Sequence, residues 1–166
     1  MSPAHFNRLG FTLIELLLVT AIIAVLAVSV FAALDPARRI DEAQNARRST
    51  DVDTILTAIH QSIVDNKGSY PTNMPAVGTE AQLGTDVTGC AIATGGCAVT
   101  QASCVDLMAN VAQDLIPFLK SMPIDPTGSP TYTSGKTGYS VLRDSNGIVT
   151  VKSCGAERGA AIDASR

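Results

Sequence analysis

Residues 11–34 read FTLIELLLVTAIIAVLAVSVFAAL, and Glu15 is the only charged residue among them. From Leu16 to Leu34 the run is apolar except for Thr20 and Ser29, whose hydroxyls can hydrogen-bond to carbonyls of their own helix. At about 1.5 Å per residue, a helix of this length crosses about 30 Å of hydrocarbon. The stretch therefore predicts a membrane-spanning helix.

Apolar runs of this kind also occur in buried core helices and in secretory signal peptides. A core helix normally keeps a polar face, which residues 16–34 lack. A signal peptide has a shorter apolar region and then a small-residue cleavage site, whereas residues 35–39, DPARR, continue as structured sequence. A span that stays in the protein is the better interpretation.

Glu15 is the exception in this helix, because an ionisable side chain in an apolar span is costly and by default indicates a function. It needs a partner of opposite charge. A cut between Gly10 and Phe11 would create an α-amino group about one helical turn from Glu15, in the same chain or in a neighbouring one. Such an ammonium–carboxylate pair offsets the desolvation of both groups.

Residues 8–10, RLG, followed by 11–16, FTLIEL, resemble the type III signal of type IV pilins and of the pseudopilins of type II secretion systems. The resemblance is specific because the cleavage site, the first Phe, the fifth-position Glu and the apolar run occur in register. It implies that a prepilin peptidase cuts after Gly10 and N-methylates Phe11. It also implies that Glu15 helps to dock each incoming subunit.

The same resemblance implies the partners: a prepilin peptidase, an assembly ATPase, an inner-membrane platform protein and further copies of this chain in a filament. It places the chain in the inner membrane as a single-pass protein with an extracytoplasmic head, in contact with lipid before assembly, and then in a cell-surface or periplasmic filament. Arg38 and Arg39 after the span favour the opposite orientation. The cleavage motif is the more specific signal, and the cysteines suit export.

The expected fold is α+β and pilin-like, with a long N-terminal helix packed on a small antiparallel sheet. We expect a leader at 1–10, a transmembrane and assembly helix at 11–34, an amphipathic helix at 35–68, a globular head at 69–154 and a flexible tail at 155–166.

Three- and four-residue spacing predicts the amphipathic helix, which is expected to end near Gly68. Its stripe consists of Ile40, Ala43, Arg47, Arg48, Val52, Ile55, Leu56, Ile59 and Ile63. Asp35-Pro36 either starts a new helix or kinks a continuous one. The charged stretch 35–53 is either a solvated helix face or a contact between subunits.

In the head, we expect a loop region over 72–96 and a second helix over Cys104–Leu115. Strands are predicted around Tyr132, over 138–143 and over 148–152, with residues 144–147, DSNG, as a hairpin turn. Two further stretches, 66–71 and 119–126, loosely resemble the heads of short bacterial pilins.

Four cysteines, Cys90, Cys97, Cys104 and Cys154, lie in the part of the chain that would be exported, so disulfides are plausible. Their spacing does not suit zinc. Four cysteines allow three connectivities. We favour Cys90–Cys97, closed through Gly95-Gly96, and Cys104–Cys154, which would tie the second helix to the last strand.

A formal net charge of −3 and a pI near 5.2 do not favour binding to nucleic acid. No GxSxG, P-loop or HExxH motif is present, so we expect no catalytic centre, no cofactor and no metal. A cysteine nucleophile with His60 is a remote alternative, and a calcium site at Asp125 and Asp144 stays open. The main competitor of a filament subunit is a single-span anchored binding protein that never polymerises. The choice between pilus, secretion pseudopilus and DNA-uptake filament also stays open.

Overall fold

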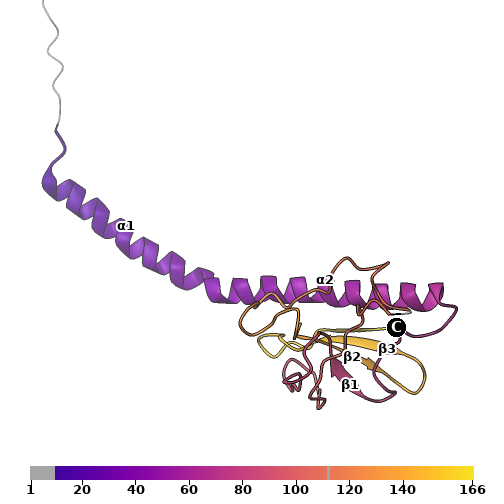
Figure 1. Cartoon of the computed structure of the whole chain (residues 1–166). Helices are drawn as coiled ribbons and strands as arrows, with labels where there is room; N and C mark the ends of the chain where they lie inside the picture. The colour runs from indigo at the N-terminus through magenta and orange to yellow at the C-terminus, as the bar shows by residue number, and fades with distance from the viewer. Residues whose placement is uncertain (1–9, 112) are drawn as a thin grey trace, which may run out of the picture. The chain divides into compact units, whose positions relative to one another are not determined.

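The computed structural model describes residues 10–111 and 113–166, so all of the predicted leader except Gly10 lies outside the described residues. The elements are α1 (Leu13–Leu34), α2 (Pro36–Asp65), β1 (Glu80–Gln82), β2 (Tyr139–Arg143), β3 (Val149–Ser153) and β4 (Asp163–Ser165) (Figure 1). The chain divides into two units, residues 1–39 and the head, residues 40–166. Two long helices and a four-stranded sheet confirm the predicted α+β, pilin-like class.

The apolar helix and the amphipathic helix are separated by a break at Asp35. Asp35 has φ 37°, in the left-handed region, which terminates α1. Pro36 is then the first residue of α2, where its missing N–H breaks no helical hydrogen bond. Of the two possibilities for Asp35-Pro36, the structure adopts a new helical start.

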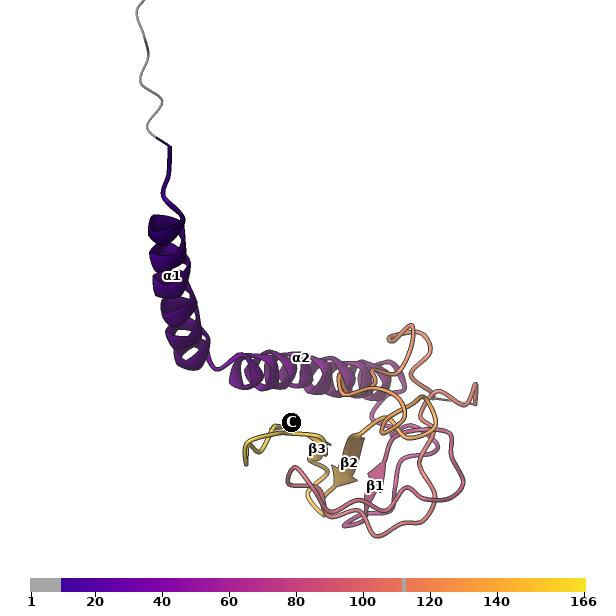
Figure 2. The same ribbon diagram turned by 90° about the vertical axis from the view of Figure 1, so that its left-hand side faces the viewer.

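Within the head, α2 packs on one face of the sheet through the predicted stripe (Figure 2). Its buried residues are Arg48, Val52, Ile55, Leu56, Ala58, Ile59 and Ser62. The apolar residues of this set meet Tyr139 and Val141 of β2 and the two valines of β3 in one hydrophobic core. Ile40 is exposed, so the apolar contact with the sheet belongs to the C-terminal part of α2.

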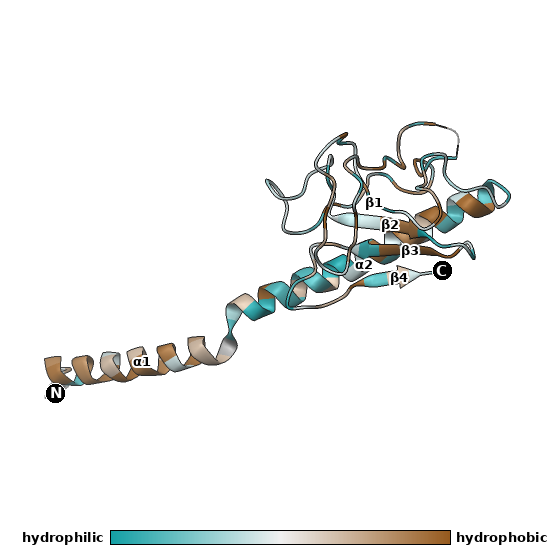
Figure 3. Ribbon diagram, turned by 90° about the horizontal axis from the view of Figure 1, so that it is seen from below, coloured by the Kyte–Doolittle hydropathy of each residue, from teal (hydrophilic) through white to brown (hydrophobic). Residues whose placement is uncertain are grey.

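The sheet is antiparallel throughout, in the order β1-β2-β3-β4 (Figure 3). β2 and β3 form the predicted hairpin, in register from Tyr139 opposite Ser153 to Arg143 opposite Val149. The turn between them is closed by Asp144, whose carboxylate accepts from the backbone N–H groups of Asn146 and Ile148 at 2.8 Å each.

Both edges of the sheet differ from the prediction. The loop expected over 72–96 contains β1, whose three residues are buried. The expected flexible tail contains β4, which pairs with β3 through Ala164 opposite Val151. Ile162 and Ala164 pack against the core, so this segment is held by apolar contact as well as by the ladder. Within the tail expected over 155–166, residues Asp163–Ser165 are therefore an edge strand of the sheet.

The second helix predicted over Cys104–Leu115 does not form in the described residues of that range. The carboxylate of Asp106 accepts from the backbone N–H of Met108 at 2.8 Å, and Asn110 and Gln113 have positive φ. Such side-chain-to-backbone bonds compete with the helical pattern. Leu115 still reaches the core, because an irregular chain can also bury it.

Tyr132 also lies outside any strand. Its backbone N–H donates to Gly128, and Thr133 and Lys136 exchange backbone hydrogen bonds across a tight turn. Tyr132 is nevertheless buried. Tyr132 therefore packs from a series of turns, and the prediction of a strand there is wrong.

The cysteines pair as Cys90–Cys104 and Cys97–Cys154, each with Cα atoms 5.3 Å apart, so the predicted connectivity is wrong. An antiparallel bridge between Ile92 and Val99 folds residues 90–104 into a small hairpin. Its base brings Cys90 beside residue 102, and Cys97 lies in the turn at its tip, where its backbone N–H donates to the carbonyl of Thr94. The two disulfide loops therefore overlap along the sequence, because Cys97 lies within the segment that Cys90–Cys104 closes.

Candidate functional site

The backbone around the predicted cleavage site lies outside regular structure. Gly10 and Phe11 precede α1, and Phe11 is 79% exposed. A Cβ atom built on Gly10 would meet nothing within 4 Å. Gly10 and Phe11 are thus both exposed in the described chain, and exposure is what a peptidase needs from a substrate.

Thr12 and Glu15 form a capping box at the start of α1. The carboxylate of Glu15 accepts from the backbone N–H of Thr12 at 3.0 Å and from its hydroxyl at 2.8 Å. In return, the Thr12 hydroxyl accepts from the backbone N–H of Glu15 at 3.3 Å. This arrangement satisfies N–H groups that have no partner inside the helix. Glu15 therefore has a local partner in the described chain.

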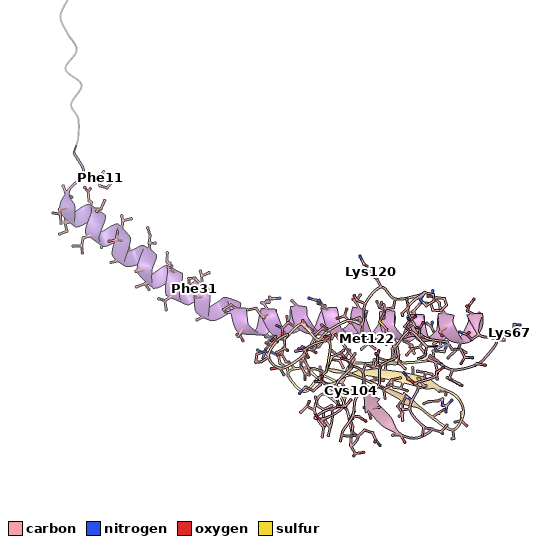
Figure 4. The ribbon with its side chains drawn as sticks, in the orientation of Figure 1. Phe11, Phe31, Lys67, Cys104, Lys120 and Met122 are labelled. Carbon is pink, nitrogen blue, oxygen red and sulfur yellow. A yellow bond between two sulfur atoms is a disulfide. The ribbon has the colours of Figure 1, made fainter. Side chains whose placement is uncertain are left out.

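The remainder of α1 is apolar on all sides, and its described side chains are exposed. Phe11 and Phe31 project outward from opposite ends of this segment (Figure 4). The two hydroxyl groups are satisfied as predicted: Thr20 donates to the carbonyl of Leu17 at 3.0 Å and Ser29 to that of Leu26 at 2.8 Å. Within the described chain, the helical stretch that begins at Leu13 is the one candidate, by length and composition, for crossing a membrane.

A second polar site, in the head, surrounds Arg48, which is 0% exposed. Its guanidinium donates to both carboxylate oxygens of Asp125, from Nε at 2.8 Å and from Nη2 at 2.9 Å. The other donors reach Thr127, Asn45 and Glu157. Burial by itself would lower the pKa of Arg48, but the hydrogen bonds and charges of Asp125 and Glu157 outweigh it and raise that pKa.

The spacing of Arg48 places it in the predicted helical stripe, but its burial was not predicted. The signal was its spacing, because Arg48, Val52 and Ile55 follow each other at intervals of four and three residues. A charged residue in register with a buried stripe indicates a buried ion pair. The partner could not be identified, because Asp125 lies 77 residues away.

Other residues of the charged stretch make contacts within their own head. Arg158 donates to Asp41 at 2.7 Å, and Arg47 lies 3.8 Å from Asp51. Asp51 also accepts the hydroxyl hydrogen of buried Tyr139 at 2.7 Å. Burial first, and then this hydrogen bond, raise the pKa of Tyr139 far above its ordinary value. Part of the stretch is therefore paired within the head and is not a wholly solvated face.

The candidate catalytic and calcium residues are engaged in structural contacts. All four cysteines are in disulfides, so none is a thiol nucleophile for His60, whose Nε2 lies 3.1 Å from the backbone oxygen of Arg166. Asp125 is held by Arg48, and Asp144 closes the hairpin turn. Across residues 10–111 and 113–166, no three His, Cys, Asp or Glu side chains are grouped to hold a metal ion.

Comparison with known proteins agrees with the N-terminal geometry. Residues 5–31 match the family model described as the prokaryotic N-terminal methylation motif, which is the signature of type IV pilins and pseudopilins. The matched segment contains Gly10, Phe11 and Glu15 and most of α1. No curated protein and no solved structure matched the chain.

Proposed function

We propose that this protein is a structural subunit of a type IV pilus-like or pseudopilus filament. It is made as a membrane-held precursor, cut by a prepilin peptidase between Gly10 and Phe11, methylated on Phe11 and assembled through α1. The observation that carries the proposal is an exposed apolar helix with Glu15 as its one charged residue, which begins three residues after Gly10, within the matched methylation motif.

The exposed apolar surface of α1 favours a polymer over a soluble monomer. Such a surface is unfavourable in water and needs lipid or another apolar surface to cover it. In the membrane the cover is hydrocarbon. Outside it, the cover most readily available is α1 of further copies. A contact between unlike surfaces of identical subunits repeats from copy to copy, and it gives a helical filament when the repeat does not close into a ring.

Glu15 gives this association a direction. In the precursor its carboxylate is satisfied by Thr12. Cleavage places a positively charged amine on Phe11, one residue before that cap. A pair between this amine and Glu15, in the same chain or in a neighbouring one, neutralises two charges that would otherwise be costly within an apolar bundle. Cleavage therefore changes the partner available to Glu15.

The proposed location and partners follow from this route. The precursor is a single-pass inner-membrane protein with its head outside the cytoplasm, where the two disulfides can form and persist. A prepilin peptidase processes it, and an assembly ATPase and a platform protein extract it from lipid into the filament.

The test is mass spectrometry of the membrane fraction and of the sheared filament fraction, from cells with and without the peptidase. We expect a methylated Phe11 terminus with the peptidase and the intact leader without it. Gly10→Val is the matched variant, because its side chain enters open space in the uncut chain and leaves the head unaltered. We expect this variant to keep its leader and to be missing from filaments. A Met1 or Ser2 terminus in wild-type filaments would contradict the proposal, as would a chain that stays single and unpolymerised, the behaviour of an anchored binding protein.

A further inference from the structure

We propose that the buried Arg48–Asp125 pair is a positioning device that fixes α2 at one axial position on the sheet. The pair joins the helix to the segment that precedes β2. It selects one packing of the head among several that apolar contacts alone would accept. The link to assembly rests on the proposed function, whereas the positional claim stands without it.

The apolar contacts of α2 do not by themselves define its axial position. Moving α2 by four residues, about 6 Å along its axis, would bring Leu56, Ile59 and Ile63 to the places of Val52, Ile55 and Ile59. These three replacements are aliphatic, whereas His60 and Ser62 would take the places of Leu56 and Ala58. Because apolar burial is not directional, the three aliphatic replacements would bury a similar area.

Arg48, in contrast, fits at one position only. A guanidinium has five N–H donors in a rigid fork. The structure gives it five hydrogen bonds, to the two oxygens of Asp125 and to Thr127, Asn45 and Glu157. A displacement of about 6 Å would leave a buried charge without its partners, which is far more costly than a change of apolar neighbour.

Asp125 is held from the other side. Its backbone N–H donates to the carbonyl of Thr137 at 2.9 Å, and its carboxylate accepts from the backbone N–H of Thr127 at 3.0 Å. Gly155 closes the site, because a Cβ atom there would overlap the carboxylate. The acceptor therefore cannot follow a shifted helix.

Stability alone does not explain this pair. The Coulomb attraction of a buried ion pair is largely offset by the desolvation of both charges, and apolar replacements are often neutral. A pair of this kind is most useful where one arrangement must be selected over another. In a filament each subunit repeats the same contacts. A shift between α2 and the sheet would therefore misplace the sheet in every copy that carries the shift.

The test measures helix position in the full-length chain in detergent. Spin labels on encoded residues, which leave the cysteines untouched, replace exposed Thr54 of α2 and exposed Ser145 of the β2–β3 turn. The variant is Arg48→Met with Asp125→Leu, which removes both charges together. The matched control is Tyr139→Phe, which removes the single hydrogen bond from the sheet to Asp51 and keeps the pair.

We expect one narrow distance distribution for the wild type and for Tyr139→Phe. For the double variant we expect a second population whose label-to-label distance differs by up to about 6 Å, at an unchanged or higher melting temperature, and a loss of filaments. An unchanged narrow distribution in the double variant would overturn the proposal, whatever the filaments do. If the double variant fails to fold, the test uses Arg48→Lys, which keeps the positive charge but lacks the guanidinium fork. A broadened distance distribution in that variant supports the proposal, and a narrow one refutes it. If the wild type forms no filaments, the proposed function fails, while the distances still decide the positional claim.

Discussion

At the scale of single residues, Glu15 and Arg48 are charged side chains in opposite surroundings. Glu15 is exposed on an apolar helix and is satisfied by its neighbour Thr12. Arg48 is fully buried and is satisfied by residues distant in the sequence. The carboxylate of Glu15 is available for a new partner, whereas the guanidinium of Arg48 is bound within the head.

Substitution of Glu15 separates its capping role from its charge. Glu15→Gln can still accept from the backbone N–H of Thr12, but it cannot pair with a charged Phe11 amine. We expect Glu15→Gln and Glu15→Ala to insert and to fold the head normally, and both to lose most filaments when expressed without wild-type protein. Electron microscopy and quantification of sheared filaments measure this. If Glu15→Gln assembles normally and Glu15→Ala fails, assembly depends on the capping contact with Thr12 and not on the charge of Glu15.

Removal of Asp125 alone is expected to destabilise the head strongly. Asp125→Ala leaves the Arg48 guanidinium buried without its main partner, which costs about 3–5 kcal/mol. Arg47→Ala is the matched control, because its 3.8 Å pair with Asp51 is 65% exposed on the arginine side and should change stability by about 1 kcal/mol or less. Chemical denaturation in detergent measures both. Equal effects would show that Arg48 is not buried in the folded head.

At the scale of elements, the head is built in three layers, with α2 on one face of the sheet and the hairpin of residues 90–104 on the other. Cys97 at the tip of that hairpin lies 3.1 Å from Ser140 of β2, and its disulfide reaches Cys154 directly after β3. The carboxylate of Glu80 in β1 accepts from Ser140 and from Lys152 of β3 on the same face. The Cys97–Cys154 bridge therefore joins the hairpin to the sheet, whereas Cys90–Cys104 closes the hairpin on itself.

The two disulfides should differ in their contribution to stability. Cys97–Cys154 has a sequence separation of 57 and Cys90–Cys104 one of 14. The chain-entropy relation gives about 4 kcal/mol for the first and about 3 kcal/mol for the second. We expect the Cys97→Ala/Cys154→Ala head to melt below the Cys90→Ala/Cys104→Ala head. Thermal unfolding under non-reducing conditions ranks them, and peptide mapping of the wild type checks the pairing. A Cys90–Cys97 peptide would reject it.

At the scale of the whole molecule, residues 1–39 and the head, residues 40–166, are separate units with different environments. The buried hydrophobic residues of the described chain all lie between Val52 and Cys154. The apolar residues of α1 contribute nothing to that core. The head should therefore fold by itself, and α1 should determine where the protein resides.

Deletion of residues 1–39 tests this division. We expect the chain from Ile40 to Arg166, made in an oxidising compartment, to be monomeric in buffer without detergent and to contain both disulfides. The full-length chain should require detergent or lipid, because its apolar helix is exposed. Size-exclusion chromatography with light scattering measures both. A head that aggregates or lacks cooperative unfolding would show that α1 contributes to its core.

Local pattern was sufficient to predict α1, the amphipathic α2 and the hairpin of β2 and β3. Each of these depends on residues close together in the chain: an unbroken apolar run, a three- and four-residue period, or strands around Asp144–Gly147. The methylation motif is local as well, so the candidate cleavage site and Glu15 could be identified from residues 8–16 alone.

The tertiary structure alone decided the disulfide pairing, the partner of Arg48 and the pairing of β4. Several pairings were compatible with the spacing of the cysteines, and the choice followed from the Ile92–Val99 hairpin, whose tip faces the sheet. Likewise, the spacing of Arg48 within the stripe is a local signal, but its partner Asp125 is identified only once the segment carrying Asp125 lies against α2. Contacts between distant segments depend on how the whole head packs, and no local pattern of residues specifies that packing.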